Sequence, residues 1–518
     1  MFKLVSTFLF IVLLSHAALG QNWEMYDLSG SLQGKVTYQN LELLGESVRV
    51  GKSDSGLFLL SADLRPIVDL QAQEVYQYLK PWIIVKGPKG LGAFHEYGQK
   101  ALPTAYDEIQ AYPTRLLAKK GSDYYVYEKS SGKTSWLGSS DQALLTHHGM
   151  VILKQGDSYY LPLSPTPEKA YEQLAVNEGN FLLSKEPSGF GLIDQEGTYV
   201  LEPVIDQLVH TRGDSYYGYD ENQYLLIRGF ENKAQVKYNS YHQITKEGDL
   251  MLEYIHGKLR RVIEEEGILL DAIGMESVTL IGKDLFNVRF RENKMGLLGK
   301  NGWLVTPNSD AEWIGNGTEG LFPAMKNGKY GYLNPSGTWA IPPSFLEVGT
   351  FSEKIAPYKN SDFWGLVSSD GKILTEPKWE EIKEFSKGIA VAKSNGSYYL
   401  IRPTGELASE LGYEKISRLK EGFYLVEKNH KMGLISALGK PILPLEYDWI
   451  EVEHKDFIVV AKEGLSGVVR GNGESFLPLA YEQIHLDMSE QKILAKEAGV
   501  EPAQQESPQP SVKRKKGE

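Results

Sequence analysis

Hydrophobic and polar positions alternate in short runs along most of the chain, and the runs recur at a nearly constant spacing. The stretch from Phe363 to Lys393 is the clearest example. Phe363 to Ser368 is a short aromatic and aliphatic run, Asp370-Gly371 follows it, and Lys372 to Thr375 returns. Two such runs joined by a dipeptide that allows positive φ are typical of a β-hairpin.

The rest of this stretch predicts a further strand and the connection to the next unit. Pro377 has no N–H to donate, so it ends pairing on the returning strand. Gly388 to Lys393 is another apolar run, and Asn395-Gly396 turns it into the first run of the following unit. The pattern therefore predicts a continuous antiparallel meander of about three short strands per repeat.

Three sets of positions recur with this unit. The first is a glycine with a turn glycine six residues later: Gly92 and Gly98, Gly191 and Gly197, Gly296 and Gly302, Gly331 and Gly337, Gly365 and Gly371, Gly433 and Gly439, Gly467 and Gly473. The second is a proline after the turn glycine: Pro103, Pro203, Pro307, Pro342, Pro377, Pro444 and Pro478. The third is a large residue three positions before an aliphatic one: Tyr38/Leu41, Tyr76/Leu79, Tyr106/Ile109, Tyr171/Leu174, Ile205/Leu208, Tyr241/Ile244, Phe345/Val348, Trp379/Ile382, Tyr413/Ile416, Tyr447/Ile450 and Tyr481/Ile484.

The spacing of these positions predicts the architecture. From Phe345 onward the third set steps by 34 residues each time. Self-similarity at such a period marks a repeat fold, and counting from Glu24 gives about fourteen units, with the register least regular between residues 110 and 290. We expect a mainly β tandem array that is open and curved or superhelical. Closed β-propeller rings are the alternative, since propeller repeats are usually longer, from about 40 residues.

The recurring glycines and prolines are interpreted as packing and turn positions. A glycine inside a strand usually marks a bulge or a close approach of another group. We expect an aromatic side chain of the third set to pack over it. The positions that define the repeat in this way are Gly92, Gly191, Gly296, Gly331, Trp364, Gly365, Gly371, Pro377, Gly433, Gly439, Pro444, Gly467 and Gly473.

The unit resembles the WG repeat, also written KWG, of bacterial exported and surface proteins. The resemblance rests on three stretches: Phe363-Trp364-Gly365-Leu366-Val367 with Asp370-Gly371 and Pro377, Lys329-Tyr330-Gly331-Tyr332-Leu333 with Gly337 and Pro342, and Lys431-Met432-Gly433-Leu434-Ile435 with Gly439 and Pro444. It covers residues 22–485, with the best copies from Lys294 onward. Of these three stretches, only the first has a tryptophan, Trp364, before the glycine. The resemblance therefore rests on the glycines and on their spacing. The resemblance implies a β-repeat protein with a binding or structural role and no catalytic residues to transfer.

The two ends of the chain differ from the repeats. Residues 1–20 are typical of a signal peptide, because Lys3 precedes an apolar run and Ala18-Leu19-Gly20 fits a small-residue cleavage site. We expect divergent repeats over 21–290, well-formed repeats over 291–485 and a C-terminal cap helix over 486–500. Residues 501–518 are rich in Pro, Gln, Ser and Glu, end in a basic cluster, and are expected to be disordered.

Composition and charge narrow the class of protein. The 518 residues include 30 Tyr, 52 Gly and no Cys, and 42% are hydrophobic, which suits a turn-rich β protein without disulfides. The formal charge of -12 argues against nucleic-acid binding, because phosphate contacts need a basic surface. After residue 20 no apolar run approaches the length of a membrane-spanning helix. The sequence thus indicates an exported protein of the periplasm, the cell surface or the medium.

The search for catalytic or ligand-binding residues predicts no cofactor, metal or catalytic site. Gly315 to Gly320 fits a dinucleotide-binding glycine pattern but lies between β-repeats, outside any βαβ unit. His147-His148 is the one histidine cluster and lacks a third ligand at metal spacing. Acidic residues follow the third set and are interpreted as a solvated edge, with a row that attracts cations as the alternative: Asp107, Glu172, Glu380, Glu414, Asp448 and Glu482.

Three functions remain open. The first is a non-enzymatic scaffold that binds a protein or cell-envelope polymer through its repeat surface. The second is carbohydrate binding by exposed aromatic residues, for which the candidates are Trp303, Trp339, Tyr124, Tyr125, Tyr159, Tyr160, Tyr398 and Tyr399. The third is a propeller-type hydrolase, which would need clustered carboxylates. We expect the first, without enzymatic activity.

Overall fold

The protein is built almost entirely from short antiparallel strands. The structure, a computed structural model, describes residues 22–499 except 232, 410 and 420–421. Among these residues the only helix is the 3-10 turn η1 (Arg291–Asn293). The predicted signal peptide and C-terminal tail lie outside the described residues. The prediction of a mainly β tandem array of meanders is confirmed.

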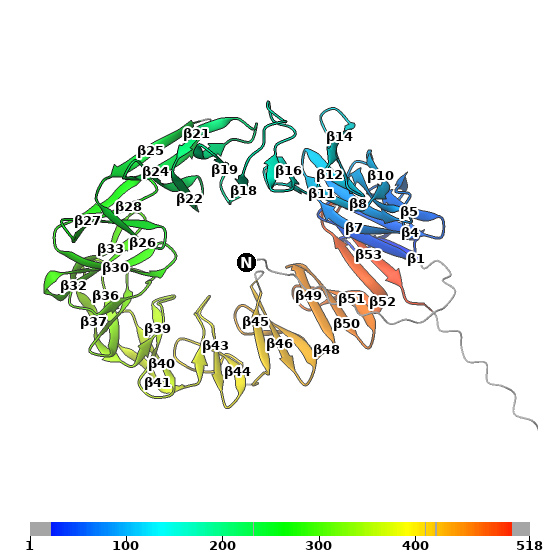
Figure 1. The fold of residues 1–518 in the computed structure, drawn as a ribbon. Helices are drawn as coiled ribbons and strands as arrows, with labels where there is room; N and C mark the ends of the chain where they lie inside the picture. The colour runs from blue at the N-terminus through cyan, green and yellow to red at the C-terminus, as the bar shows by residue number, and fades with distance from the viewer. Residues whose placement is uncertain (1–21, 232, 410, 420–421, 500–518) are drawn as a thin grey trace, which may run out of the picture. The chain divides into compact units, whose positions relative to one another are not determined.

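The strands of the described chain form thirteen sheets, twelve of three or four strands and one of seven (Figure 1). In the first part of the chain the sheets are β3 (Asn40–Leu44) to β4 (Val48–Ser53), β5 (Gly56–Leu60) and β6 (Pro66–Asp69); β7 (Glu74–Leu79) to β8 (Trp82–Gly87), β9 (Gly90–His95) and β10 (Lys100–Tyr106); β11 (Glu108–Tyr112) to β12 (Arg115–Lys120), β13 (Asp123–Glu128) and β14 (Lys133–Ser139); β15 (Gln142–Leu145) to β16 (Val151–Gln155) and β17 (Ser158–Tyr160); and β18 (Gln173–Ala175) to β19 (Leu182–Glu186), β20 (Gly189–Ile193) and β21 (Tyr199–Ile205).

The next six sheets have the same order of strands. They are β22 (Gln207–Arg212) to β23 (Ser215–Asp220), β24 (Gln223–Phe230) and β25 (Lys233–Ser240); β26 (Gln243–Glu247) to β27 (Leu250–Ile255), β28 (Lys258–Glu264) and β29 (Gly267–Asp271); β30 (Met275–Gly282) to β31 (Leu285–Phe290), β32 (Lys294–Gly299) and β33 (Gly302–Ser309); β34 (Trp313–Ile314) to β35 (Phe322–Lys326), β36 (Lys329–Leu333) and β37 (Trp339–Phe345); β38 (Glu347–Val348) to β39 (Ile355–Lys359), β40 (Trp364–Ser368) and β41 (Ile373–Trp379); and β42 (Glu381–Ile382) to β43 (Ala390–Ser394) and β44 (Ser397–Ile401). A twelfth small sheet runs β45 (Lys415–Arg418), β46 (Phe423–Lys428), β47 (Lys431–Ser436), β48 (Pro441–Tyr447).

The seven-stranded sheet joins the two ends of the array. Its order is β2-β1-β53-β52-β51-β50-β49, with β1 (Asn22–Asp27), β2 (Leu32–Thr37), β49 (Trp449–His454), β50 (Phe457–Lys462), β51 (Leu465–Arg470), β52 (Ser475–Asp487) and β53 (Lys492–Glu497). The first half of β52 pairs with β51 and the second half with β53, so this sheet contains two meanders. With the twelve smaller sheets this gives 12 + 2 = 14 meanders, matching the predicted number of repeats.

Two compact units divide the chain. One contains the residues up to Asp69 together with those from Tyr447, and the other runs from Leu70 to Glu446. In the first unit, Trp23 stacks on His485 with ring centroids 5.5 Å apart, and the Arg49 guanidinium forms a buried ion pair with Asp487. The N-terminal and C-terminal segments therefore form one core in this unit.

The predicted cap helix over 486–500 is wrong. The chain turns after Asp487 and returns as β53, which lies between β52 and β1. Ile493, Leu494 and Ala495 are fully buried there, because successive side chains point to opposite faces of the sheet and a hydrophobic cluster covers each face. A helix at this place would have left the edges of β1 and β52 without partners, which is costly for buried backbone groups.

The glycines and prolines of the repeat meet in one local structure. In the sheet β38 to β41, Trp364 is opposite Trp379 and Leu366 is opposite Thr375, so β41 bulges around Pro377 opposite Gly365. A Cβ on Gly365 would lie 2.5 Å from the carbonyl oxygen of Thr375 and 3.0 Å from the nitrogen of Pro377. Proline suits this bulge because it has no N–H that would be left unpaired.

The same contact recurs at the corresponding glycines. The backbone of the opposite strand lies about as close to the Cβ position of Gly92, Gly191, Gly296, Gly331, Gly433 and Gly467. The expected cover by a third-set aromatic is therefore wrong for these positions, since backbone lies there, joined by Trp303 at Gly296 and by Tyr358 at Gly365. The turn glycines have positive φ, as in Gly371 at 85°, Gly439 at 79° and Gly473 at 90°, which fits their predicted place in tight turns.

Side chains of one repeat also bond to the backbone of the next. The Ser352 hydroxyl donates to the carbonyl oxygen of Phe385 at 2.6 Å, and Thr318, 34 residues earlier, donates to the carbonyl oxygen of Phe351. The Glu353 carboxylate accepts the backbone N–H of Lys387 and, at 2.8 Å, that of Gly388. These bonds connect one end of each of the three successive sheets from β34 to β44.

Most third-set residues are buried, as expected for core positions. Tyr38, Tyr106, Tyr171, Ile205, Phe345, Trp379, Tyr413, Tyr447 and Tyr481 all belong to the core. Tyr76 and Tyr241 do not, with 58% and 71% of their surface exposed. In these two repeats Leu70 and Ser240 are buried at the equivalent positions. The alignment of the repeats that was predicted there is therefore wrong.

Replacing a bulge glycine should destabilise the fold measurably. We expect Gly331→Ala to lower the free energy of unfolding by about 1–3 kcal/mol, because its Cβ would lie 2.4 Å from the carbonyl oxygen of Ile341. The matched control is Gly282→Ala, whose nearest neighbour is a Leu285 methyl at 3.8 Å. Urea unfolding followed by tryptophan fluorescence measures both, and equal stability of the two variants would contradict the proposed contact.

Candidate functional site

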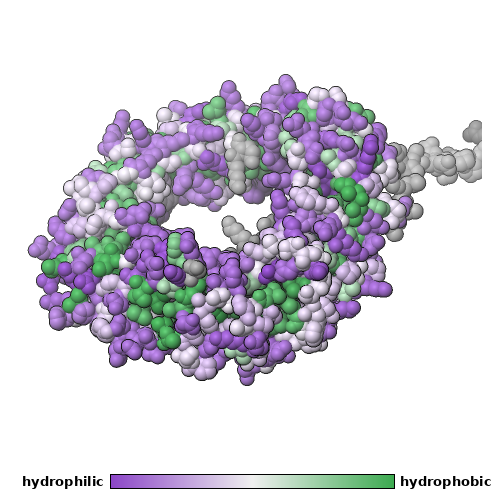
Figure 2. All heavy atoms as spheres, turned by 90° about the horizontal axis from the view of Figure 1, so that it is seen from above, coloured by the Kyte–Doolittle hydropathy of each residue, from purple (hydrophilic) through white to green (hydrophobic). Residues whose placement is uncertain are grey.

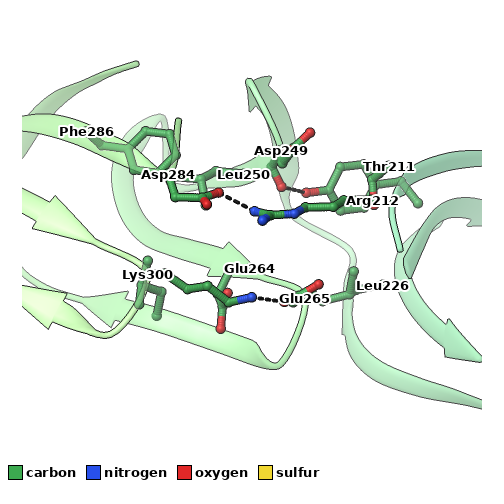
Figure 3. A pocket seen from close by; sticks show the side chains of 12 residues that line it. Thr211, Arg212, Leu226, Asp249, Leu250, Glu264, Glu265, Asp284, Phe286 and Lys300 are labelled. Carbon is green, nitrogen blue, oxygen red and sulfur yellow. Dashed lines mark hydrogen bonds and ion pairs between the residues drawn. The ribbon is translucent and has the colours of Figure 1, made fainter. Parts of the chain in front are cut away.

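A pocket lies where three consecutive repeats meet within the unit from Leu70 to Glu446. The sheets β22 to β25, β26 to β29 and β30 to β33 all contribute to it, and its cavity volume is about 30 Å³, within a hollow of about 460 Å³ that includes open solvent. Its charged rim comes mainly from the tight turns of the hairpins. The lining residues are Thr211, Arg212, Tyr217, Leu226, Asp249, Leu250, Glu264, Glu265, Leu269, Asp284, Phe286 and Lys300 (Figure 3).

Ion pairs across the repeats hold most of the rim. Arg212 at the end of β22 pairs with Asp284 in the turn before β31. Lys300, in the turn after β32, pairs with Glu265 in the turn after β28 (Figure 3). Each pair joins different sheets, so the rim residues also connect the repeats that form the pocket.

Glu264 differs from the other carboxylates of the pocket. It is the last residue of β28 and half-buried, and within the described part of the chain its carboxylate has no hydrogen bond or ion pair. Burial raises the pKa of Glu264, and the neighbouring Glu265 raises it further, whereas Lys300 and Arg228 act in the opposite direction. A half-buried carboxylate without a direct partner costs folding free energy, so it marks a candidate binding group.

The pocket combines this carboxylate with an apolar wall. Leu226, Leu250 and Phe286 are buried, and Leu269 is half-buried. The rim has two cations, Arg212 and Lys300, and four carboxylates, which belong to Asp249, Glu264, Glu265 and Asp284. Its net charge is therefore 2 - 4 = -2. Such a site suits a cationic group on an apolar stem, which is the chemistry of a lysine or arginine side chain.

The glycine-rich stretch from Gly315 to Gly320 is a tight loop between β34 and β35. A Cβ on Gly317 would lie 2.3 Å from the carbonyl oxygen of Leu321, and Thr318 forms a bridge with Leu321. The backbone is thus folded on itself between two strands. This differs from a dinucleotide site, which needs a helix N-terminus at the loop.

The histidine pair His147-His148 lies in the turn between β15 and β16. The His148 Nε2 is 2.9 Å from the carbonyl oxygen of Gly179, and burial together with His148 lowers the pKa of His147. In the residues that the structure describes, no three His, Asp or Glu side chains converge as a metal site would require. Nor does any helix in those residues have the length and hydrophobicity to cross a membrane.

The aromatic residues predicted for carbohydrate binding do not form an exposed row. All eight are buried or half-buried. Trp303 contacts Phe290, and the Trp339 indole N–H donates to the Asp310 carboxylate. The strongly exposed aromatic residues are others, among them Tyr97, Trp136 and Tyr241. Figure 2 shows one face as mainly hydrophilic with small hydrophobic areas.

Several residues of the predicted acidic edge cap the next hairpin turn. The Asp107 carboxylate accepts the backbone N–H of Gly121 at 2.7 Å, and Glu380 accepts that of Gly396 at 3.4 Å. Asp448 accepts the N–H of Glu463 at 2.6 Å. Others pair with lysines, as Glu172 does with Lys185. These carboxylates therefore have local structural partners.

Comparison with known proteins supports the repeat assignment. The family model of the WG containing repeat matches four consecutive stretches, residues 330–362, 364–398, 400–431 and 432–465. Residues 330–465 therefore contain four tandem copies of the WG containing repeat. No curated protein matches the sequence.

Some solved structures resemble the chain at low similarity. PorZ, a surface component of the type-IX secretion system of Porphyromonas gingivalis, is 10% identical with a TM-score of 0.22, covering 88% of this chain and 85% of its own. The extracellular domain of BT3049 from B. thetaiotaomicron is 12% identical with a TM-score of 0.21, covering 87% and 75%. The WD40 β-propeller domain of Doa1 is 12% identical with a TM-score of 0.20, covering 50% and 89%. Similarity at this level carries no argument about function.

Neutralising Glu264 should stabilise the protein at neutral pH. Its raised pKa means that the folded chain holds this proton more tightly than the unfolded chain, so the ionised group opposes folding at pH values above the folded pKa. We expect Glu264→Gln to raise the melting temperature at pH 7, and the gain to shrink as the pH falls through the folded pKa toward the ordinary value of 4.5. The control is Glu276→Gln, at an exposed position of β30. Thermal unfolding between pH 4 and 8 tests this, and a lower melting temperature at pH 7 would contradict it.

Proposed function

We propose that the chain is an exported, non-enzymatic repeat scaffold that binds a protein partner, and that the pocket in Figure 3 accepts a basic side chain of that partner. The observation that carries this proposal is Glu264, a half-buried carboxylate with no direct partner beside an apolar wall. An ionised carboxylate that is half-buried without a partner lowers the free energy of unfolding. A cation that binds beside it offsets this loss, so such a carboxylate suits a binding site.

The arrangement of charges favours recognition over catalysis. A hydrolase of the glycosidase type needs two carboxylates free to act on opposite sides of one bond. Here Asp284 and Glu265 are held by Arg212 and Lys300, and Asp249 is exposed, so Glu264 is the one carboxylate outside ion pairs that is half-buried beside the apolar wall. A lysine or arginine side chain needs only one such carboxylate, with apolar contacts along its stem.

Export is supported by the sequence of residues 1–20, which has the three parts of a signal peptide. The absence of cysteine is compatible with an oxidising compartment, since no free thiol is exposed there. The periplasm and the cell surface both fit this proposal. A cell-envelope polymer is the second candidate partner, provided that it presents cationic groups.

A pair of short peptides tests the pocket directly. Both have a central residue flanked by leucines, which is lysine in one peptide and the uncharged isostere norleucine in the other. We expect the lysine peptide to bind more tightly, and Glu264→Gln to remove this preference, while Glu276→Gln keeps it. Calorimetric titration of the mature chain measures the affinities. Equal binding of both peptides, or a preference that survives in Glu264→Gln, would contradict the proposed site.

A further inference from the structure

A second hollow lies between two neighbouring sheets of the unit from Leu70 to Glu446. The sheets β11 to β14 and β15 to β17 form most of it, and Leu174 of β18 also lines it. Its cavity volume is about 490 Å³, within a hollow of about 970 Å³ that includes open solvent. A volume of this size is typical of ligand sites, so the charges of this hollow, here called the Lys154 groove, determine which ligand it suits.

A cross-strand pair of charges recurs in the repeats. In four sheets a glutamate on the first strand lies opposite a lysine on the second strand. These pairs are Glu74 with Lys86, Glu108 with Lys119, Glu347 with Lys359 and Glu381 with Lys393. The first three are ion pairs, with nitrogen–oxygen distances of 3.5, 3.9 and 3.5 Å. In these repeats the glutamate therefore supplies the lysine with a carboxylate.

The sheet β15 to β17 departs from this pattern. Lys154 on β16 lies opposite Gln142 on β15, which has no charge. The next residue, Asp141, has another partner, because its carboxylate accepts the backbone N–H of Gly156 at 2.8 Å. Within the described residues the Lys154 ammonium forms no hydrogen bond or ion pair and lies 5.6 Å from the ring centroid of Tyr159. Lys154 is therefore a half-buried cation without a carboxylate partner.

Two other lysines at this position also face an uncharged residue. Lys52 is opposite Asn40, but its side chain is exposed and well hydrated. Lys185 is opposite Gln173 and forms an ion pair with Glu172 at 3.2 Å. Lys154 differs from both, because it is half-buried and lines a groove.

Apolar side chains surround this cation. Ile152 and Leu174 are buried at the groove, and Leu144 is 45% exposed. The other lysine of the groove, Lys119, lies beside Glu108, as described above. The groove therefore offers one unpaired cation next to apolar surface, which suits a carboxylate on an apolar stem.

We propose that the Lys154 groove binds an acidic side chain, glutamate or aspartate, of a partner protein. The carboxylate of the partner pairs with the Lys154 ammonium and takes the role that the facing glutamate has in other repeats. The methylene groups of the acidic residue and its apolar neighbours contact Leu144, Ile152 and Leu174.

The openness of the groove favours a protein side chain over a free small carboxylate. A small ion in an open groove keeps most of its water and gains little from one cation. A side chain is positioned by the other contacts of its protein, so one ion pair with apolar contacts then adds to an existing association. The inference rests on the proposed function in taking a protein as the partner. It does not depend on the pocket in Figure 3, which lies on other sheets.

Two short peptides test the charge requirement. Both have a central residue flanked by leucines, which is glutamate in one peptide and glutamine in the other. We expect the mature chain to bind the glutamate peptide about threefold more tightly or better, and added salt to reduce this preference. Calorimetric titration of the mature chain measures both affinities.

Two variants locate the preference at the groove. Lys154→Gln removes the cation. Gln142→Glu restores the facing glutamate of the other repeats and adds an ion pair, so it should keep the chain folded. Each should make the two peptides bind equally. The matched control is Lys359→Gln, because Lys359 also lies 5.6 Å from a ring centroid, that of Trp364, but is paired with a glutamate. It should keep the preference.

Equal binding of the two peptides to the unaltered chain would overturn the proposal. So would a preference that survives in Lys154→Gln or in Gln142→Glu, or one that Lys359→Gln abolishes as well. Glu264→Gln, which tests the pocket in Figure 3, should leave the preference for glutamate intact. A failure at that pocket is thus distinguishable from a failure at the Lys154 groove.

Discussion

The close approach of backbone to the Cβ position of one glycine in each of seven repeats is the contact on which the rest of the fold depends. In the sheet β38 to β41, the bulge around Pro377 occupies the space where any side chain at position 365 would lie. Glycine admits the bulge and proline leaves no donor unpaired within it, so the two residues act together. The bulge turns the outer strand toward the next repeat, where Trp379 enters the core.

The spacing set by these bulges determines where the hairpin turns of successive repeats meet. Bonds such as Ser352 to Phe385 hold neighbouring repeats together at one end of the sheets from β34 to β44. In the region of β22 to β33 ion pairs add to such bonds, and Arg212–Asp284 and Lys300–Glu265 connect the repeats. The pocket lies between these turns, with Glu264 beside its apolar wall. The features common to the repeats thus form the fold, and residues that differ between the repeats form the candidate site.

The sequence predicted the framework well because its signals are local and repeated. Asp370-Gly371, Pro377 and Trp379 each require a particular backbone or buried position, and the same types return every 34 residues. The prediction was wrong for β53, whose partner strand is far away in the sequence. Ile493 and Leu494 lie in an apolar pattern that also fits a short helix. Pairing with β1 makes this segment a strand, and no residue near position 490 indicates that pairing. The pocket was missed for a similar reason, because Arg212 and Asp284 are 72 positions apart and neither belongs to a recurring set.

Crosslinking from inside the pocket tests the proposed binding of a protein most directly. A photoreactive amino acid at position 269, which lines the pocket together with Glu264, would be activated in the cells that produce the protein, followed by mass spectrometry of attached proteins and of bound glycans. The account predicts a small, reproducible set of proteins attached near a lysine or arginine, and loss of that set in Glu264→Gln. Recovery of glycan without protein would contradict it, and turnover of that glycan would also contradict the non-enzymatic role.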